Sequence, residues 1–246
     1  DHIKGLKEYT GIFEKKDRAI NFYFVDNNVP ADNPTDSFKT YLDYKERQQH
    51  TFKICRGLQL AYLNKSRDGI SSSNIEFLWP DRSQPCFHEA LGNANAGIRC
   101  NDISPIIKYT APNGLVYLWF GDMETPMLEE VFKVINIPRA DIVFAPHHGR
   151  TSGSIPEGIL QAINPQVIVL GIAESEYMNY YKGWCDIPQY SAGDITFFND
   201  SKGAFVCFSK GGSYMPSEGK WVFEKSKSVD EFGRCIGYIK KDRIYE

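Results

Sequence analysis

The sequence predicts an α/β fold, because apolar runs of strand length alternate with helix-start signals. Each run is four to eight residues long and rich in Val, Ile and aromatic residues, which is typical of buried strands. Alternation of such strands with helices is the pattern of layered α/β domains. The three clearest runs are residues 115–120, 141–145 and 167–172.

Two helices are expected between these strands. Thr125 has the character of an N-cap and is followed by Pro126 at the first helical position, which predicts a helix that ends near residue 134. Ser154 and Glu157 have the spacing of a capping box and predict a second helix that ends near residue 163.

The rest of the chain gives a mixed pattern. A helix is expected over residues 3–9, and apolar periodicity predicts helix over residues 35–63. Gly, Asn and Pro make residues 81–101 look irregular. Further strands are expected at residues 20–25, 74–79, 103–109, 194–199 and 203–208.

Composition excludes several classes of protein. The chain has 246 residues, 42% hydrophobic and 24% charged, with a formal net charge of −3, which suits a globular domain rather than a disordered chain or a purely electrostatic nucleic-acid binder. It contains no apolar run of about 18 residues, so we expect no membrane span. The six cysteines form no CxxC pair, which argues against a zinc ribbon. The chain is too long and too apolar to need disulfides, which favours reduced thiols in a cytoplasmic protein.

Polar residues directly follow two of the predicted strands. Asp122 comes after Gly121 at the end of one, and His147, His148 and Gly149 come after Pro146 at the end of another. Ligands of α/β proteins bind at the carboxyl ends of strands, and carboxylate and imidazole together suit zinc, manganese or iron. Taken singly, these residues also fit an ordinary turn aspartate and a pair of solvated histidines.

A second carboxylate–imidazole pair stands at the start of the chain. Asp1 and His2 precede the first expected helix. With Asp122 and the histidine pair, they supply two carboxylates and two or three imidazoles. That set is nearly enough for a two-metal centre that activates a water for hydrolysis.

These motifs give the chain a resemblance to the metallo-β-lactamase fold superfamily, and more narrowly to the soluble hydrolase domain of the ComEC-type DNA-uptake proteins. The first match is to the second half of the family's HxHxDH motif. In chain order the matching segments are Asp1-His2-Ile3-Lys4-Gly5-Leu6, Leu78-Trp79-Pro80, Asn101-Asp102-Ile103-Ser104, Phe120-Gly121-Asp122 and Ala145-Pro146-His147-His148-Gly149.

The resemblance implies an αββα four-layer sandwich, of which residues 1–210 would form the C-terminal portion. An insert at about 26–73 and a tail or small appendage at 211–246 fall outside the family pattern. The two histidines and the first strands of that pattern are absent from the chain, and it does not begin with Met. We therefore expect the natural N-terminus to lie upstream.

The resemblance also implies roles for the metal-binding candidates. Asp1 and His2 would bind a metal, and Asp1 would orient the attacking water. Asp122 would bridge two metals. His147 or His148 would complete the shell while the other contacts the leaving group or a phosphoryl oxygen; which does which stays open, and His148 is assigned to catalysis together with Asp1.

Other residues have lesser roles in this interpretation. Asn101 and Ser104 are assigned to substrate binding, and Asn101 or Asp102 stands where many superfamily members carry a histidine ligand. His88 lies outside the motifs and is interpreted as structural. A few aromatic residues are candidates for lining a pocket, although core packing is favoured for the first of them: Trp119, Trp184, Tyr180 and Tyr181.

The predicted function is hydrolysis of phosphodiester bonds by water activated at two divalent metal ions, zinc first and manganese second, with a nuclease as the specific form. The expected substrate is then nucleic acid or another phosphodiester, and the chain is a candidate part of a larger protein or assembly. Two alternatives stay open: a small-molecule esterase of the same fold, and a degenerate, non-catalytic scaffold module in a larger assembly. The fold alone does not choose among them.

Overall fold

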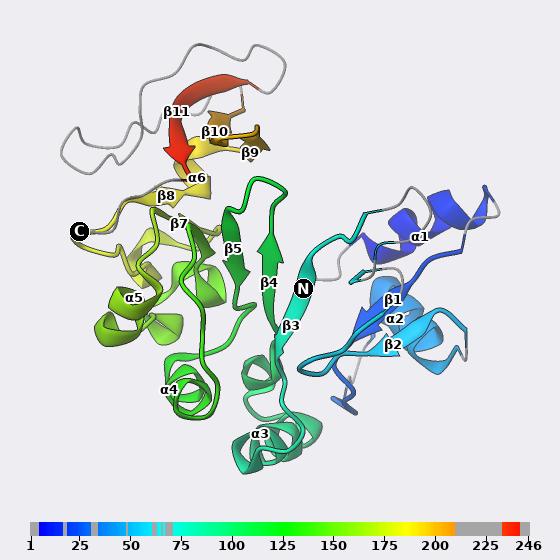
Figure 1. Ribbon diagram of the computed structural model, residues 1–246. Coiled ribbons are helices and arrows are strands. Elements are labelled where there is room, and N and C mark those ends of the chain that lie inside the picture. The colour runs from blue at the N-terminus through cyan, green and yellow to red at the C-terminus, as the bar shows by residue number, and fades with distance from the viewer. Residues whose placement is uncertain are drawn as a thin grey trace.

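The computed structural model describes residues 5–16, 19–30, 34–47, 49–60, 63–64, 66, 71–209 and 233–241. At its centre is a mixed six-stranded sheet with the order β3-β4-β5-β6-β7-β8 (Figure 1). The strands are β3 (Ile75–Trp79), β4 (Ile106–Thr110), β5 (Val116–Trp119), β6 (Ile142–Phe144), β7 (Val167–Leu170) and β8 (Asp186–Pro188). The expected α/β class is confirmed.

The strand directions bring the ends of several strands to one edge of this sheet. β3, β4 and β5 pair antiparallel, whereas β5, β6, β7 and β8 pair parallel. The carboxyl ends of the four parallel strands therefore share an edge with the amino end of β4.

Three helices cover one face of the sheet: α3 (Pro85–Asn95), α4 (Thr125–Val134) and α5 (Glu157–Ile163). Successive strand side chains point to opposite faces, and Leu118, Val143 and Ile168 point to this one. They share a buried apolar cluster with Leu128 of α4 and Leu160 of α5.

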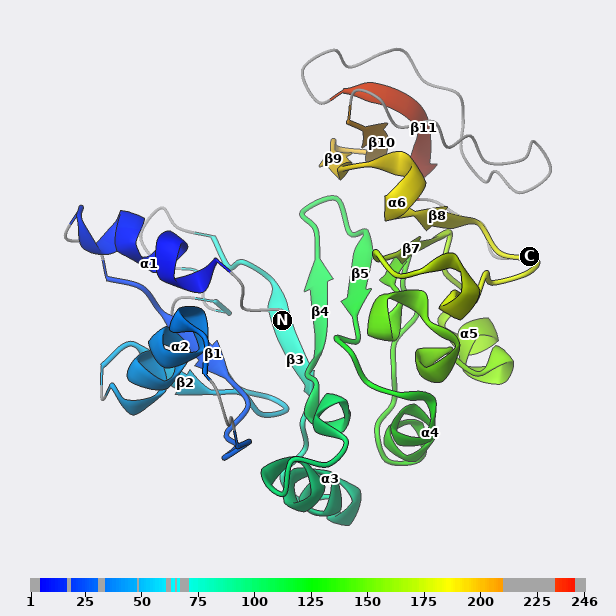
Figure 2. The same cartoon turned by 180° about the vertical axis from the view of Figure 1, so that it is seen from behind.

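A second, three-stranded sheet packs on the opposite face (Figure 2). It is antiparallel with the order β11-β10-β9, formed by β9 (Ile195–Asn199), β10 (Gly203–Phe208) and β11 (Arg234–Lys240). The alternate strand residues Tyr117, Ile142 and Val169 meet Val206 and Phe208 of β10 in a second buried cluster. The described part of this region thus has three layers: helices, a large sheet and a small sheet.

A small unit of α1 (Leu6–Glu14), β1 (Phe22–Phe24), α2 (Asp36–Glu46) and β2 (Thr51–Lys53) lies beside the β3 edge of the large sheet (Figures 1 and 2). β1 and β2 pair parallel. The Tyr23 ring lies 6.2 Å from that of Phe77 in β3, and Val25 and Ile54 extend the helix-side core.

The structure corrects two of the predicted segments. Residues 35–63 are not one helix: α2 ends at Glu46, and Phe52 of β2 stacks on Tyr23 at 5.2 Å, so strand pairing overrides the helical period. Residues 81–101 are not irregular, because α3 buries Phe87, Ala90 and Ala94 along one side. Its Gly92, which suggested a break, is an exposed position of that helix.

Both predicted helix caps are also wrong in detail. Thr125 is the first residue of α4, after Glu124, and its Oγ1 donates to the carbonyl of Ser154 at 2.8 Å. α5 begins at Glu157, after Pro156, with no side-chain cap. Both helices begin beside a proline, which fixes a helix-compatible φ without a capping side chain.

Strand β8 was not anticipated, and β4 begins later than expected, after a 3₁₀ turn at Cys100–Ile103. Part of the C-terminal segment expected as a tail forms β11, which pairs with β10 and buries Ile239. Among the described residues, no helix has both the length and the apolar character needed to cross a membrane.

Candidate functional site

The candidate site lies at the carboxyl edge of the parallel strands. Asp122 follows β5, His148 follows β6, Gly171 follows β7 and Gln189 follows β8. All four line one cavity of about 300 Å³, together with the aromatic rings of Trp119 and Phe144, which are stacked 4.6 Å apart. The sheet topology thus gathers residues that are far apart in the sequence.

Asp122 and His148 face each other across this cavity. The distance from His148 Nε2 to Asp122 Oδ1 is 3.7 Å, and their side chains are 32% and 17% exposed. This distance is longer than a hydrogen bond. An imidazole nitrogen and a carboxylate oxygen that converge in this way are the donor types of zinc sites.

The loop that carries His148 has an unusual backbone. His147 has φ 49°, His148 φ 61° and Gly149 φ 84°, all in the left-handed region that non-glycine residues rarely adopt. The amide of His147 donates to the carbonyl of Gly121 at 2.9 Å, which ties this loop to the one that carries Asp122. Such local strain is typical of functional sites.

Gly171 makes room for the His148 ring. A Cβ at this position would lie 2.8 Å from His148 Nδ1, closer than real Cβ contacts come, and 3.0 Å from the His148 Cβ, which is tighter than most. The glycine is therefore needed for the close approach of the β7 end to His148, and it fixes one side of the imidazole.

The two histidines point to different partners. His147 Nδ1 hydrogen-bonds to Ser152 Oγ at 3.0 Å, and the two imidazole centroids are 6.4 Å apart. His148 lines the cavity and His147 does not. The structure therefore places His148, not His147, opposite Asp122.

Asn101 and Ser104, the predicted substrate contacts, lie behind Asp122 rather than in the wall of the cavity. Ser104 Oγ accepts a hydrogen bond from the amide of Asp122 at 3.1 Å, and Asn101 Nδ2 donates to Glu124 Oε1 at 3.3 Å. Both therefore contact the Asp122 loop.

Two further candidates are placed elsewhere, and two are not described. His88 is on α3, where its Nε2 hydrogen-bonds to the carbonyl of Arg82 at 2.8 Å. Tyr181 is buried, and its hydroxyl accepts from the amide of Ile155. Asp1 and His2 lie outside the described residues.

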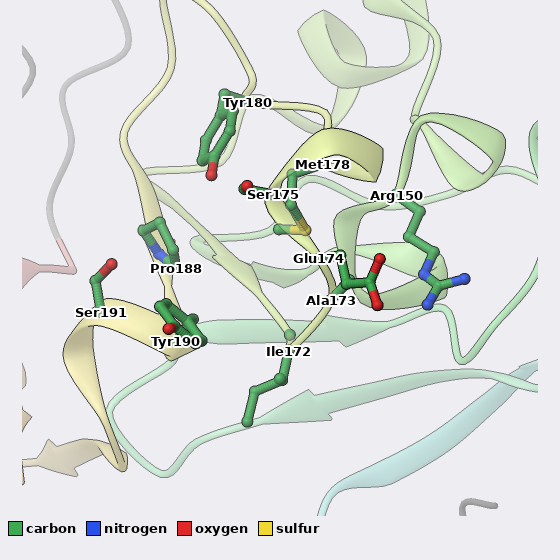
Figure 3. A pocket seen from close by; sticks show the side chains of 11 residues that line it. Arg150, Ile172, Ala173, Glu174, Ser175, Met178, Tyr180, Pro188, Tyr190 and Ser191 are labelled. Carbon is green, nitrogen blue, oxygen red and sulfur yellow. The ribbon is translucent and has the colours of Figure 1, made fainter.

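A larger cavity, of about 530 Å³, adjoins the first and shares Gly171 with it (Figure 3). Tyr190 and Tyr180 line it on one side, and Arg150 and Glu174 lie together on the other. The exposed fractions of Tyr190 and Tyr180 are 81% and 51%. Arg150 and Tyr190 are functional candidates that sequence reasoning missed; Arg150 directly follows the His-His-Gly segment, which was an available signal.

Among the described residues, the Asp122–His148 pair is the candidate for binding a metal ion. Within the described ranges, no group of three or more His, Cys, Asp or Glu side chains is arranged to hold a metal ion. The pair fits two positions of a divalent-metal shell by donor type.

Sequence comparisons assign the chain to no known group: no protein-family model matches it, and no curated protein matches its sequence.

Asp102, near the candidate site, is a buried carboxylate, and its ionised form lowers the free energy of unfolding. Burial raises its pKa, and the Arg99 guanidinium, 2.9 Å away, offsets this only in part. A carboxyl group whose pKa is raised by folding destabilises the protein increasingly as pH rises from its unfolded-state value of about 3.9 to its higher value in the folded protein. We expect the free energy of unfolding of Asp102→Asn, measured by urea denaturation, to increase relative to that of wild type as pH is raised above about 4. An advantage that shrinks over that range would contradict this assignment.

Proposed function

We propose that this protein is a metal-dependent hydrolase of the metallo-β-lactamase superfamily that cleaves phosphodiester bonds. The observation that carries the proposal is the convergence of Asp122 and His148, 3.7 Å apart, at the ends of strands β5 and β6. β5 and β6 are adjacent and parallel, so both side chains reach one cavity.

The layer order supports the proposed αββα fold. Helices α3, α4 and α5, the six-stranded sheet and the three-stranded sheet correspond to three successive layers of such a sandwich. The candidate residues also occur at strand ends in the chain order of the superfamily motifs, with Asp122 after β5 and His148 after β6.

The chemistry follows from the residues at the cavity. A bound divalent ion supplies a Lewis acid and an acidified water. Asp122 would hold this ion. The hydrogen bond from the Asp122 backbone N–H to Ser104 Oγ would help to position its carboxylate. His148 would either hold the ion or pass a proton to the leaving oxygen, within reach of the same space. Asp1 and His2 are the proposed remaining ligands, and a second ion would share Asp122.

The adjoining cavity favours a phosphodiester with aromatic groups, as in nucleic acid. Arg150 offers a guanidinium, which is well suited to phosphate. Its Nε is buried with no hydrogen-bond partner within the described part of the chain. Tyr180 and Tyr190 present exposed rings on which bases can stack. A small ester would use neither feature.

The role of Arg150 is testable by kinetics. We expect Arg150→Met to raise KM for a single-stranded oligonucleotide about tenfold with kcat changed less than about threefold, because a remote phosphate contact supplies uniform binding. Lys182→Met is the matched control, since Lys182 is exposed and does not line the cavity. Equal KM values for the two variants would argue against Arg150 as a substrate contact.

The position of the His148 ring is testable through Gly171. Gly171→Ala places a Cβ 2.8 Å from His148 Nδ1, so we expect the turnover of folded protein to fall about tenfold or more as the ring is displaced. Gly158→Ala, in α5 with no atom within 4 Å of the new Cβ, should leave turnover unchanged. Turnover is measured by steady-state hydrolysis, with circular dichroism to normalise for folded protein.

Substrate class is tested by comparing two chromogenic compounds. The protein supplied with zinc or manganese should release nitrophenol from bis(4-nitrophenyl) phosphate faster than from 4-nitrophenyl acetate, relative to the metal ion alone. Cleavage of only the carboxyl ester would replace the phosphodiesterase proposal with an esterase. Cleavage of neither would favour a binding module.

A further inference from the structure

Strands β10 and β11 place two cysteines directly opposite each other. Cys207 and Cys235 are register partners in this antiparallel pair, next to a bulge where Val206 pairs with Gly237. The Cys207 and Cys235 thiols interact with each other, and Cys235 Sγ donates to the carbonyl of Gly237 at 3.4 Å. Both are thiols in this structure.

The backbone positions suit a covalent link. Opposed residues of antiparallel strands have Cα atoms about 4.5–5.5 Å apart. Disulfides span Cα separations of about 4.4–6.8 Å. Because paired residues of antiparallel strands present their side chains to the same face of the sheet, Cys207 and Cys235 lie side by side on one face.

We propose that Cys207 and Cys235 form a modification site at which exchange with a small-molecule disulfide links strands β10 and β11 covalently. This site is separate from the proposed hydrolase site, since neither cysteine lines either of the two cavities described above.

The two cysteines have different parts in the exchange. Cys207 is fully buried, whereas Cys235 is partly exposed. Burial raises the pKa of the Cys207 thiol to about 12, with a smaller contribution from Cys235. The partly exposed Cys235 is therefore the first to react, because a buried thiol forms little thiolate.

The reaction balances as two thiol–disulfide exchanges. The Cys235 thiolate attacks one sulfur of the small disulfide, forms a mixed disulfide and releases one thiolate. Cys207, after losing its proton to solvent, attacks Cys235 Sγ and releases the second thiolate. The two cysteines are oxidised, and the small disulfide is reduced to two thiols. The high pKa of Cys207 makes the second step slow, within the range of seconds to hours known for such exchanges.

The bond would restrain the C-terminal strand. β11 buries Ile239 in the core between the sheets, and the carbonyl of its Lys240 accepts from Gln166 Nε2 at 3.0 Å. A disulfide to β10 closes a loop between residues 207 and 235 in the unfolded chain, which lowers the entropy of the unfolded state and so disfavours unfolding. We expect the melting temperature of the oxidised protein to rise by several degrees.

The test uses purified protein incubated with excess oxidised glutathione, followed by alkylation of free thiols and peptide mass mapping. A peptide pair joined through Cys207 and Cys235, with the loss of two hydrogens, is the expected product, and dithiothreitol should reverse it. Cys207→Ser should stop at a glutathione adduct on Cys235, and Cys235→Ser should leave Cys207 unmodified. Cys86→Ser, on α3, is the matched control and should form the link normally.

Two results would overturn the proposal. One is wild-type protein in which Cys207 remains alkylatable after Cys235 has become a stable glutathione adduct. The other is a mapped disulfide that joins either cysteine to a different partner. The wild-type map requires no variant, so misfolding of a serine variant would leave the conclusion intact. Both results are independent of hydrolysis or metal binding.

Discussion

Asp122→Asn is expected to lower metal-dependent phosphodiester hydrolysis by about a hundredfold or more, with little change in the free energy of unfolding. Asparagine has nearly the same shape as aspartate, and the backbone N–H at this position still donates to Ser104 Oγ. It loses the charge that faces His148 at 3.7 Å and that a cation at this position needs. Initial rates with bis(4-nitrophenyl) phosphate at saturating zinc measure the effect.

A matched carboxylate gives the control for this prediction. Glu176 is exposed and belongs to neither cavity. Glu176→Gln changes the net charge equally and should keep the wild-type rate. If Asp122→Asn also kept it, the assignment of this strand end as the reaction site would be wrong.

Phe208→Ala is expected to destabilise the protein by about 3–5 kcal/mol. Phe208 is 1% exposed and lies between the two sheets with Val206 and Tyr117. Its removal leaves a cavity at the layer contact that supports the proposed sandwich. Urea unfolding measures the change.

The neighbouring strand provides a comparison for this effect. Phe198 of β9 is 39% exposed, and its ring is 6.3 Å from that of Phe205. Phe198→Ala should cost less than about 1.5 kcal/mol, because less apolar area leaves the core. Similar losses for both variants would mean that the face of β10 that carries Phe208 does not form the interior.

The strand–helix alternation was predictable because β5, β6 and β7 are strongly apolar and bounded by clear helix starts. Helix α3 could not be predicted, because Gly92 and the asparagines of this segment suggest a break in the helix. Its stability comes instead from the burial of Phe87 and Ala94 in the core. Strand β8 contains only Asp186–Pro188, and its pairing with β7 is a tertiary effect that no local pattern shows.

Asp122 and His148 could be found from the sequence because each closely follows an apolar strand. The choice between His147 and His148 could not, because it depends on left-handed backbone angles and on the space that Gly171 leaves. Tyr190 could not be predicted as a site residue, because its position depends on β8, which no local pattern predicts. It follows that strand, in the short helix α6 (Gln189–Ala192).

The most direct test of the proposed function is the metal content of the purified protein, measured with its hydrolytic activity before and after chelation. We expect zinc or manganese to be bound and phosphodiester hydrolysis to disappear with EDTA and return when the metal is restored. Asp122→Ala should lower both metal content and activity. Full activity in metal-free protein would contradict the proposal.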